Sequence, residues 1–299
     1  MRWSVLLGNR ELQLTDRAPF DLVSAQGIGV APVRRLTERG PFQDGDTDIG
    51  FRLDPRTINL VLFFAAGNEA QADGCRDSLA SYFQGLNRSL ALRCARADGT
   101  TRQIDCYVTG MVDLPLDAQN RIGDSQKVAV QLRAPDPIWY DPQPRYFGLM
   151  GGSSTGASGF HVAMAVPWVV TTQSYIDNTF PLVCPGSWSE YPILTIHGPA
   201  SNVGIYNLTT GDALLLPYLG LGAGRWIQID CRYGHKSVVD DGGDNRISEL
   251  SDDSDLATFR LAVDPEAEGG VNMLRFAVVG SADNNTGLQV QYYDRYMAA

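Results

Sequence analysis

The chain has 299 residues, enough for two domains that each bury their own core, although one large β domain also fits this length. It is 44% hydrophobic and 19% charged, with 31 glycines and 16 prolines, which excludes a disordered or purely helical protein. Its net charge of −10 disfavours binding to nucleic acid or insertion at an anionic membrane, and no apolar run approaches the ~18 residues of a membrane span.

The acidic residues and the cysteines narrow the possible fold class and the kinds of site further. The 34 acidic residues are mostly Asp, which favours turns and caps over helix interiors, so the composition predicts many short strands joined by polar turns. The five cysteines are widely spaced and include no Cys-x-x-Cys pair, so we expect reduced, buried thiols and neither a disulfide framework nor a zinc site. The N-terminus lacks a secretory signal pattern, which predicts assembly in a cytoplasm.

The first 134 residues read as an antiparallel β domain with one packed helix. Short β-type segments are expected at 3–7, 12–14, 58–64, 90–94, 104–108 and 128–132. The helix is expected from about Asp73 to Asn87, with Asp73 or Asp77 as its N-cap. Its apolar face has helical spacing and comprises Leu79, Tyr82, Phe83 and Leu86.

An acidic stretch precedes the segment 58–64. Asp44, Asp46 and Asp48 alternate as in a calcium-binding EF-hand loop, but the sixth and twelfth positions of such a loop hold Ile49 and Pro55. The required glycine and bidentate glutamate are therefore missing. The stretch is interpreted as an acidic turn that leads into a strand.

The second half follows a segment with four prolines in ten residues, which bars a regular helix or a central strand. We therefore expect domain 1–134, a proline-rich linker 135–144 and a C-terminal β-sandwich of jelly-roll or galectin-like type at 145–299. The segment 145–190 has no clear place in that sandwich. The expected strands are 192–197, 203–207, 213–216, 226–231, 237–239, 258–263, 273–279 and 288–292.

Sequence motifs for catalysis are weak. A Gly-x-Ser-x-Gly pattern at 152–156 continues into more glycine and serine instead of a helix, so a nucleophile elbow is disfavoured. The three histidines lie far apart, and no metal-ligand spacing connects them. The aspartate clusters at 240–245 and 252–255 are interpreted as turns, with calcium binding as the less favoured alternative. No catalytic residue, cofactor or metal site is predicted.

Aromatic residues of the second half offer a candidate carbohydrate contact. Trp188, Tyr292 and Tyr293 are the residues selected for it, because aromatic rings stack on sugars in many β-sandwich binding domains. Packing in a core or a subunit contact is the alternative. Trp226 lies in an alternating segment and is as compatible with the inner face of a strand as with the outer one.

The order of several short motifs resembles one protein family, the distal tail (Dit) proteins of long-tailed, non-contractile bacteriophages. In the first half these motifs are 44–48, 51–58 and the proline-rich 133–142. In the second half they are Tyr191-Pro192, 197–202, Asn207, Thr210-Gly211, Ile229-Asp230, Asp253-Ser254 and Asn272. The resemblance spans nearly the whole chain, with 145–190 as the departure.

The resemblance implies a structural virion protein without catalysis. It implies a homo-hexameric ring at the end of the tail, between the tail tube protein and the tail-tip hub or baseplate, with N-terminal domains in the ring and C-terminal sandwiches projecting outward. Such a protein is a component of the virion tail tip and assembles in the host bacterial cytoplasm. Under this reading Asp44, Asp46 and Asp48 form one half of a subunit contact, and Arg52 and Arg56 form the other.

Two functions from other classes are also compatible with the sequence. The first is a carbohydrate-binding adhesion module of the tail tip, which would engage receptor-binding proteins or a host surface glycan. The second is a cell-wall-degrading enzyme, because glycoside hydrolysis uses a pair of carboxyl groups and the 34 acidic residues offer many such pairs.

Overall fold

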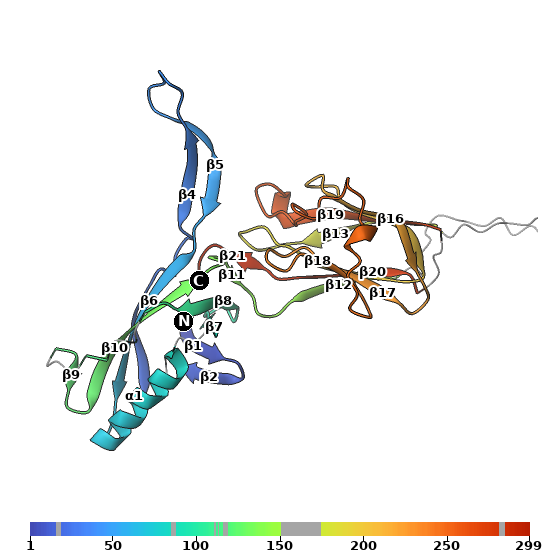
Figure 1. Cartoon of the computed structure of the whole chain (residues 1–299). Helices are drawn as coiled ribbons and strands as arrows, with labels where there is room; N and C mark the ends of the chain where they lie inside the picture. Colours follow the sequence, from blue (N-terminus) through green and yellow to red (C-terminus); the bar gives the residue numbers. More distant parts are fainter. Residues whose placement is uncertain are drawn as a thin grey trace, which may run out of the picture. The chain divides into compact units, whose positions relative to one another are not determined.

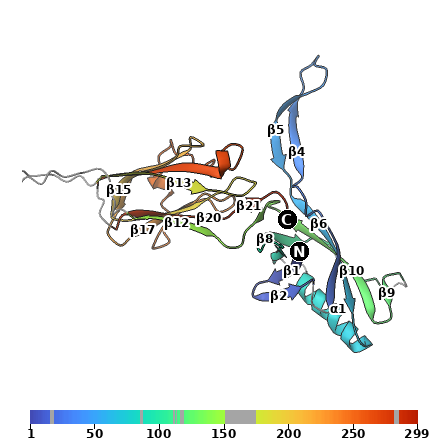
Figure 2. The same ribbon diagram turned by 180° about the vertical axis from the view of Figure 1, so that it is seen from behind.

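The computed structural model describes residues 1–15, 19–84, 88–110, 112, 114–115, 119–150, 175–280 and 285–299. They form two compact units, each traced in Figures 1 and 2. Unit 1 consists of Met1–Pro142 and Arg295–Ala299, and unit 2 consists of Gln143–Asp294. Each unit has its own buried apolar core. The predicted mainly β fold, with one helix in the first half and a β-sandwich in the second, is confirmed.

Unit 1 is built on an antiparallel sheet with the strand order β2-β1-β7-β8-β10-β6-β3. Two short strands extend it, since β9 pairs with β10, and β11 pairs with both β8 and β21. These strands are β1 (Arg2–Leu7), β2 (Arg10–Gln13), β3 (Phe20–Gln26), β6 (Arg56–Ala65), β7 (Leu90–Ala95), β8 (Thr101–Val108), β9 (Arg121–Ile122), β10 (Ser125–Ala134), β11 (Trp139–Tyr140) and β21 (Arg295–Tyr296).

Alternation of apolar and polar residues explains the long strands of this sheet. In β10, Val128, Val130 and Leu132 are buried, while the residues between them are exposed. The same alternation recurs in β6, whose buried members pair in register with those of β10. Because successive side chains of a strand point to opposite faces, this pattern buries one face against the core and leaves the other in solvent.

Helix α1 (Glu69–Phe83) covers part of the same core. Leu79, Tyr82 and Phe83 are buried as predicted. The helix begins four residues before the predicted start, because the Asn68 side chain accepts a hydrogen bond from the Gln71 amide and caps the first turn. Of the four predicted apolar positions, Leu86 lies outside the described residues.

Strands β4 (Val33–Glu38) and β5 (Thr47–Leu53) form a separate two-stranded hairpin in unit 1. Figure 1 shows this hairpin extending beyond the main sheet of the unit. In the chain it directly precedes β6. A bulge lies between Leu36 and Thr37, where Ile49 has no partner in the register. The acidic turn predicted at 44–48 therefore lies at the end of the hairpin and runs into β5.

Unit 2 is a sandwich of two antiparallel sheets. One sheet has the order β12-β20-β14-β17-β18, the other β13-β19-β15-β16, and apolar side chains of both sheets share one core. The strands are β12 (Arg145–Met150), β13 (Tyr175–Val183), β14 (Ile193–His197), β15 (Ala200–Asn207), β16 (Ala213–Leu221), β17 (Trp226–Asp230), β18 (Ser237–Asp240), β19 (Val271–Val279) and β20 (Gly287–Tyr292). Short 3-10 helices lie at η1 (Ile247–Glu249) and η2 (Glu268–Gly270).

The boundaries of the two units differ from those expected from sequence. The proline-rich segment 135–142 belongs to unit 1, where Ile138 and Trp139 are buried and Trp139 packs edge-on against Trp3. The last five residues also return to unit 1, because β21 pairs with β11. One predicted strand is absent, since 258–263 forms turns and a single bridge to Glu190. Within the unassigned segment 145–190, β12 and β13 are both strands of the sandwich.

Candidate assembly surface

The β4–β5 hairpin exposes an unusual amount of apolar surface. Phe42 at its turn is fully exposed, and Ile49 and Phe51 on β5 are exposed by 62% and 50%. Val33 on β4 is also exposed. An isolated two-stranded hairpin is only marginally stable in water, and exposed apolar side chains gathered on one element typically mark a contact surface. The hairpin therefore has the composition of an element that is covered by another protein surface.

Charged residues on the hairpin divide into two groups. The first group is paired within the hairpin: Arg35 donates to the Asp48 carboxylate at 2.9 Å, and Arg34 donates to Asp54 at 3.1 Å. The second group consists of Glu38, Arg39, Asp44, Asp46 and Arg52, which are exposed and have no ion-pair partner among the residues that the structure describes. Of the predicted contact residues, Asp44, Asp46 and Arg52 are available to an external partner, whereas Asp48 is engaged internally.

Arg56 corrects the predicted subunit contact. Its side chain is only 1% exposed, so it cannot reach a neighbouring subunit. Its guanidinium donates to the backbone carbonyls of Gly27 at 2.7 Å, Pro137 at 3.0 Å and Met297 at 2.9 Å, and also to the carbonyl of Gly29. The alternation of β6 places this arginine on the inner face, which the sequence motif alone did not reveal.

The carboxyl-terminal segment completes this arrangement. Arg102 donates to the carbonyl of Ala298 and lies over the Tyr296 ring at 3.9 Å. The Ala299 amide donates to the carbonyl of Ile28 at 3.0 Å. Residues 295–299 thus form a strap, held by two arginines, that belongs to the fold of unit 1.

Burial removes one of the three residues of the predicted carbohydrate contact, Tyr292. Tyr292 is buried in the core of unit 2, where its hydroxyl donates to the Val183 carbonyl and burial raises its pKa to about 12. It is therefore unavailable to a ligand. Trp188 and Tyr293 are half-buried and engaged within the chain, with the Tyr293 hydroxyl accepting from Gln291. Strand β20 turns Tyr292 inward because its neighbours Val290 and Leu288 are core residues.

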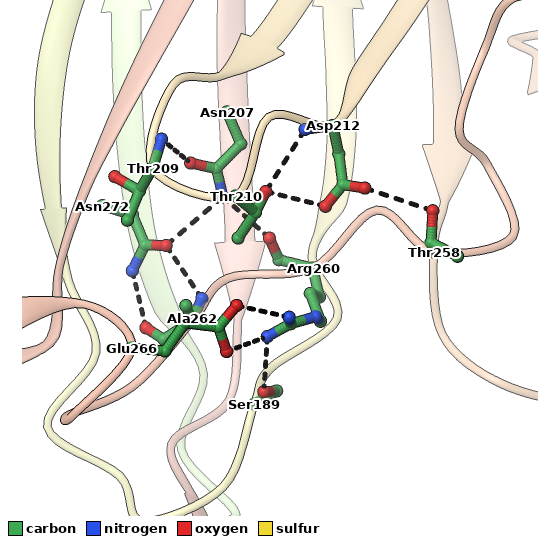
Figure 3. A network of polar contacts seen from close by, with 10 residues as sticks. All are labelled: Ser189, Asn207, Thr209, Thr210, Asp212, Thr258, Arg260, Ala262, Glu266 and Asn272. Carbon is green, nitrogen blue, oxygen red and sulfur yellow. Dashed lines mark hydrogen bonds and ion pairs between the residues drawn. The ribbon is translucent and has the colours of Figure 1, made fainter. Parts of the chain in front are cut away.

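Several second-half motifs of the sequence meet in one polar network, shown in Figure 3. The buried amides of Asn207 and Asn272 contact each other at 3.3 Å, and Asn272 also bonds to both backbone groups of Ala262 at 2.8 Å. Asn207 donates to the Arg260 carbonyl and accepts from the Thr209 amide. These bonds engage the side-chain amides of both asparagines. The network therefore holds loops of the sandwich in place and has a structural role.

Charged and hydroxyl groups extend this network at its rim. Asp212 accepts hydrogen bonds from Thr210 at 2.7 Å and from Thr258 at 3.1 Å. Arg260 forms a two-pronged ion pair with Glu266, which lowers the pKa of that carboxyl. The aspartate cluster at 240–245 is likewise a turn, because Asp240 accepts from the amides of Gly242 and Asp244.

The described residues give little support for a metal site or a reactive thiol. They contain no cluster of three His, Cys, Asp or Glu side chains that could hold a metal ion. The five cysteines are buried and unpaired, as predicted, and burial raises the pKa of Cys106 and of Cys231 to about 12. The Gly-x-Ser-x-Gly pattern at 152–156 lies outside the described residues. In the described part of the chain, no helix is both long and apolar enough to span a membrane.

The fold has a close counterpart among solved structures. The Dit protein of phage SPP1, described as a paradigm of the hub of the adsorption apparatus in phages that infect Gram-positive bacteria, matches with a TM-score of 0.66. The match covers 98% of this chain and 98% of that chain, at 14% sequence identity. The chain has the Dit fold. The Dit resemblance predicted from the sequence is thereby confirmed at the level of the fold.

Two further structures match the Dit fold of this chain more distantly. A chain of the phage p2 baseplate in its activated conformation with Sr has a TM-score of 0.46 at 7% identity, over 97% of each chain. A chain of the phage P2 baseplate with Ca has a TM-score of 0.43 at 8% identity, over 94% of this chain and 98% of that one. No family sequence model and no curated protein sequence matches the chain.

Sequence reasoning missed the hairpin as an element. Strand β5 contains Gly50, and β4 contains two adjacent arginines, so neither segment shows the buried alternation that identifies a strand. The available signal was Phe42, Ile49 and Phe51, large apolar residues close to an acidic turn in a stretch with no core pattern.

Proposed function

We propose that the protein is a structural component of a phage tail, a distal tail hub without catalytic activity. The observation that carries this proposal is the likeness to SPP1 Dit, which extends over both units of the chain. Its finer form is a homo-hexameric ring between the tail tube protein and the tail-tip or baseplate proteins, assembled in the host bacterial cytoplasm. Unit 1 supplies the ring, and unit 2 supplies contacts with other components of the tail tip.

The hairpin supports a ring in which each copy covers the next. A ring is a closed heterologous assembly, so each copy needs two different complementary surfaces. The hairpin provides one such surface through Phe42, Ile49 and Phe51, whose burial on assembly is favourable. The unpaired Asp44 and Asp46 at its turn and Arg52 toward its base have opposite charges, so they suit contacts between neighbouring copies.

Solution mass tests the ring directly. Multi-angle light scattering of the whole chain should give six times the 32.6 kDa mass of one chain. The double variant Phe42→Ser/Phe51→Ser should shift the mass toward the monomer, because it removes apolar contact area without touching the core. Tyr218→Ser, which alters a ring on β16 that is 86% exposed, is the matched control and should leave the mass unchanged.

A charge exchange tests the polar part of the contact. Asp46→Arg should weaken the ring, and Asp46→Arg/Arg52→Asp should restore part of the loss, because the opposite charges are then exchanged between copies. Cryo-electron microscopy of the virion gives the independent measurement of position. If neither the isolated protein nor the particle contains a ring of this chain, the proposal is wrong.

A further inference from the structure

One face of the five-stranded sheet in unit 2 points away from the core. Leu194, Ile196, Ile227 and Ile229 on its middle strands point inward. The residues between them point outward, and the pairing register aligns them across the sheet. One row crosses all five strands and consists of Gly148, Gln289, Thr195, Gln228 and Val239. We call this row, with the rows on either side of it, the outer face.

The central row of the outer face carries hydrogen-bonding groups and no charge. The Gln228 amide donates to the Thr195 hydroxyl at 3.3 Å, which places an amide and a hydroxyl side by side. The side-chain amide of Gln289, paired with Thr195 in the register, has no hydrogen bond within the described part of the chain. Amide donors and acceptors are therefore presented together at the middle of the face.

Aromatic rings flank this row. Trp226 and His197 are directly opposite each other in the next row, and both are half-buried. Tyr146 lies in the row on the other side and is 60% exposed. Rings of this kind offer flat apolar surfaces to a ligand, while their polar atoms reach solvent.

Charges at the border of the face are paired with one another. Arg225, next to Trp226, is bound to Asp241 at 2.7 Å. At the opposite end of strand β17, Arg232 is bound to Asp230 at 2.7 Å. These pairs leave the centre between them electrically neutral.

The face is open beside Gln289. A Cβ atom at Gly148, the partner of Gln289 in β12, would meet no atom within 4 Å. The backbone of Gly148 is also outside the left-handed region. There is thus room for ligand atoms next to the amide, and a Cβ atom can be placed at this position without a clash.

We propose that the outer face binds a neutral carbohydrate. Sugar hydroxyls satisfy the amides of Gln289 and Gln228, and the C–H faces of sugar rings stack on Trp226. An anionic polymer would find no unpaired cation at the centre. A protein partner would meet little aliphatic surface in the central row, where Val239 is the one aliphatic side chain. The inference concerns a ligand site in unit 2 and stands independently of the ring.

The outer side of the other sheet of the sandwich has a different composition. Its outer side exposes Val183, Val271 and Met273 on β13 and β19, with Val183 and Val271 directly opposite each other. Aliphatic surface of this kind suits a protein contact and gives a sugar no hydrogen bonds. The two faces of unit 2 thus differ in chemistry, and only the amide-rich one suits a polyhydroxylated ligand.

The test is a binding experiment with the whole chain. An array of neutral oligosaccharides built from glucose, galactose and N-acetylglucosamine identifies a probe, and calorimetric titration of that probe gives its affinity. We expect saturable binding that does not change between low and high salt. Trp226→Ala and Gln289→Ala should each weaken binding by roughly tenfold, as expected for one lost ring or amide contact.

Two variants make the result specific. Gly148→Phe fills the open space without removing any contact, so it should abolish binding while the circular dichroism spectrum is unchanged. Tyr218→Ala removes a ring that is 86% exposed on the opposite sheet and should leave the affinity unchanged.

Several outcomes would overturn the proposal. One is the absence of saturable binding to every neutral oligosaccharide on the array, and another is binding that Trp226→Ala, Gln289→Ala and Gly148→Phe all leave intact. Binding confined to anionic glycans and weakened by salt would also contradict it. A change of solution mass in Gly148→Phe without sugar binding would assign the face to a protein contact. A failure here leaves the hexameric mass of the chain, and hence the hub proposal, untouched.

Discussion

At the scale of single residues, Arg56 connects segments of unit 1 that are distant in the sequence. It is a buried cation that binds only neutral backbone carbonyls, and these four carbonyls belong to three separate segments of unit 1. Burial lowers its pKa, yet a guanidinium keeps its charge in proteins because its ordinary pKa exceeds 12. The planar fork of arginine can serve several carbonyls at once, which a lysine ammonium cannot do in the same geometry.

Replacing Arg56 should therefore destabilise the protein strongly. Arg56→Met leaves four carbonyls without their donor in a buried site, and we expect a loss of at least about 3 kcal/mol in the free energy of unfolding. Urea denaturation followed by tryptophan fluorescence measures it. Arg52→Met, four residues away and exposed, is the matched control and should change stability by less than about 0.5 kcal/mol. Equal effects of the two variants would refute the role given to Arg56.

The ion pair of Arg260 and Glu266 should make stability depend on pH in the acid range. The pKa of Glu266 is lowered in the folded state, chiefly by its hydrogen bonds to Arg260. Its contribution is therefore fully present above the unfolded-state pKa of about 4.3 and is lost as the pH falls through the lower folded-state pKa. Solvent screening keeps it below about 1 kcal/mol, since both side chains are partly exposed.

Thermal melts between pH 7 and pH 3 test this contribution. Glu266→Gln should lower the melting temperature at pH 7 and should show a shallower decline toward pH 3 than the parent chain. A variant whose melting temperature runs parallel to that of the parent at every pH would show that Glu266 contributes nothing to acid sensitivity.

At the scale of elements, the hairpin and the carboxyl-terminal strap have opposite characters. In the described part of unit 1, the hairpin contributes no side chain to the buried core. It exposes apolar residues, so its order depends on what covers it. The strap is short, yet it is held by β21–β11 pairing and by hydrogen bonds to Arg56 and Arg102. A five-residue segment thus contributes more to the fold of unit 1 than a hairpin of about twenty.

Removal of residues 295–299 should destabilise unit 1 selectively. The truncation deprives Arg56 and Arg102 of carbonyl acceptors and leaves Trp139 without its strand partner Tyr296. We expect a lower melting temperature for the unit 1 transition in calorimetry and an unchanged transition for unit 2. Arg295→Ala, which removes the ion pair to the exposed Asp136 and keeps the backbone of the strap, is the control and should have a smaller effect. An unaltered thermogram after truncation would refute the role of the strap.

At the scale of the whole molecule, the chain consists of one interrupted unit and one continuous unit. Unit 1 consists of residues 1–142 and 295–299. Its last segment therefore follows unit 2 in the chain. Unit 2 has its own core between two sheets and takes all its strands from 143–294. This organisation resembles the insertion of a β-sandwich between β11 and β21 of a host domain.

An isolated fragment of residues 143–294 should therefore fold. Its core requires no side chain from unit 1, and the fragment buries enough apolar surface for a domain of this size. We expect a β-type circular dichroism spectrum and a cooperative thermal transition. A fragment of residues 1–142, which lacks the strap, is the comparison and should be markedly less stable. An unfolded 143–294 fragment would contradict the division into these units.

The sequence by itself determined the fold class and most of the elements. The alternation of Val128, Val130 and Leu132 and the helical spacing of Leu79, Tyr82 and Phe83 report local burial, and the structure confirms both. The order of the short motifs indicated the Dit fold, because chain order survives where identity has fallen to 14%. The turns predicted from the acidic stretches are also confirmed, since the acidic residues at 44–48 and 240–245 lie in or beside turns.

Only the tertiary structure decided which side each residue faces and what it meets. Arg56 and Arg52 lie four positions apart in one motif, yet pairing of β6 buries the first, while the separate hairpin exposes the second. Tyr292 and Trp226 are both aromatic residues of strands, but register turns one inward and the other outward. The physical reason is that burial depends on contacts between segments distant in the sequence, such as the contact of Met297 with Arg56. A local sequence pattern does not encode such contacts.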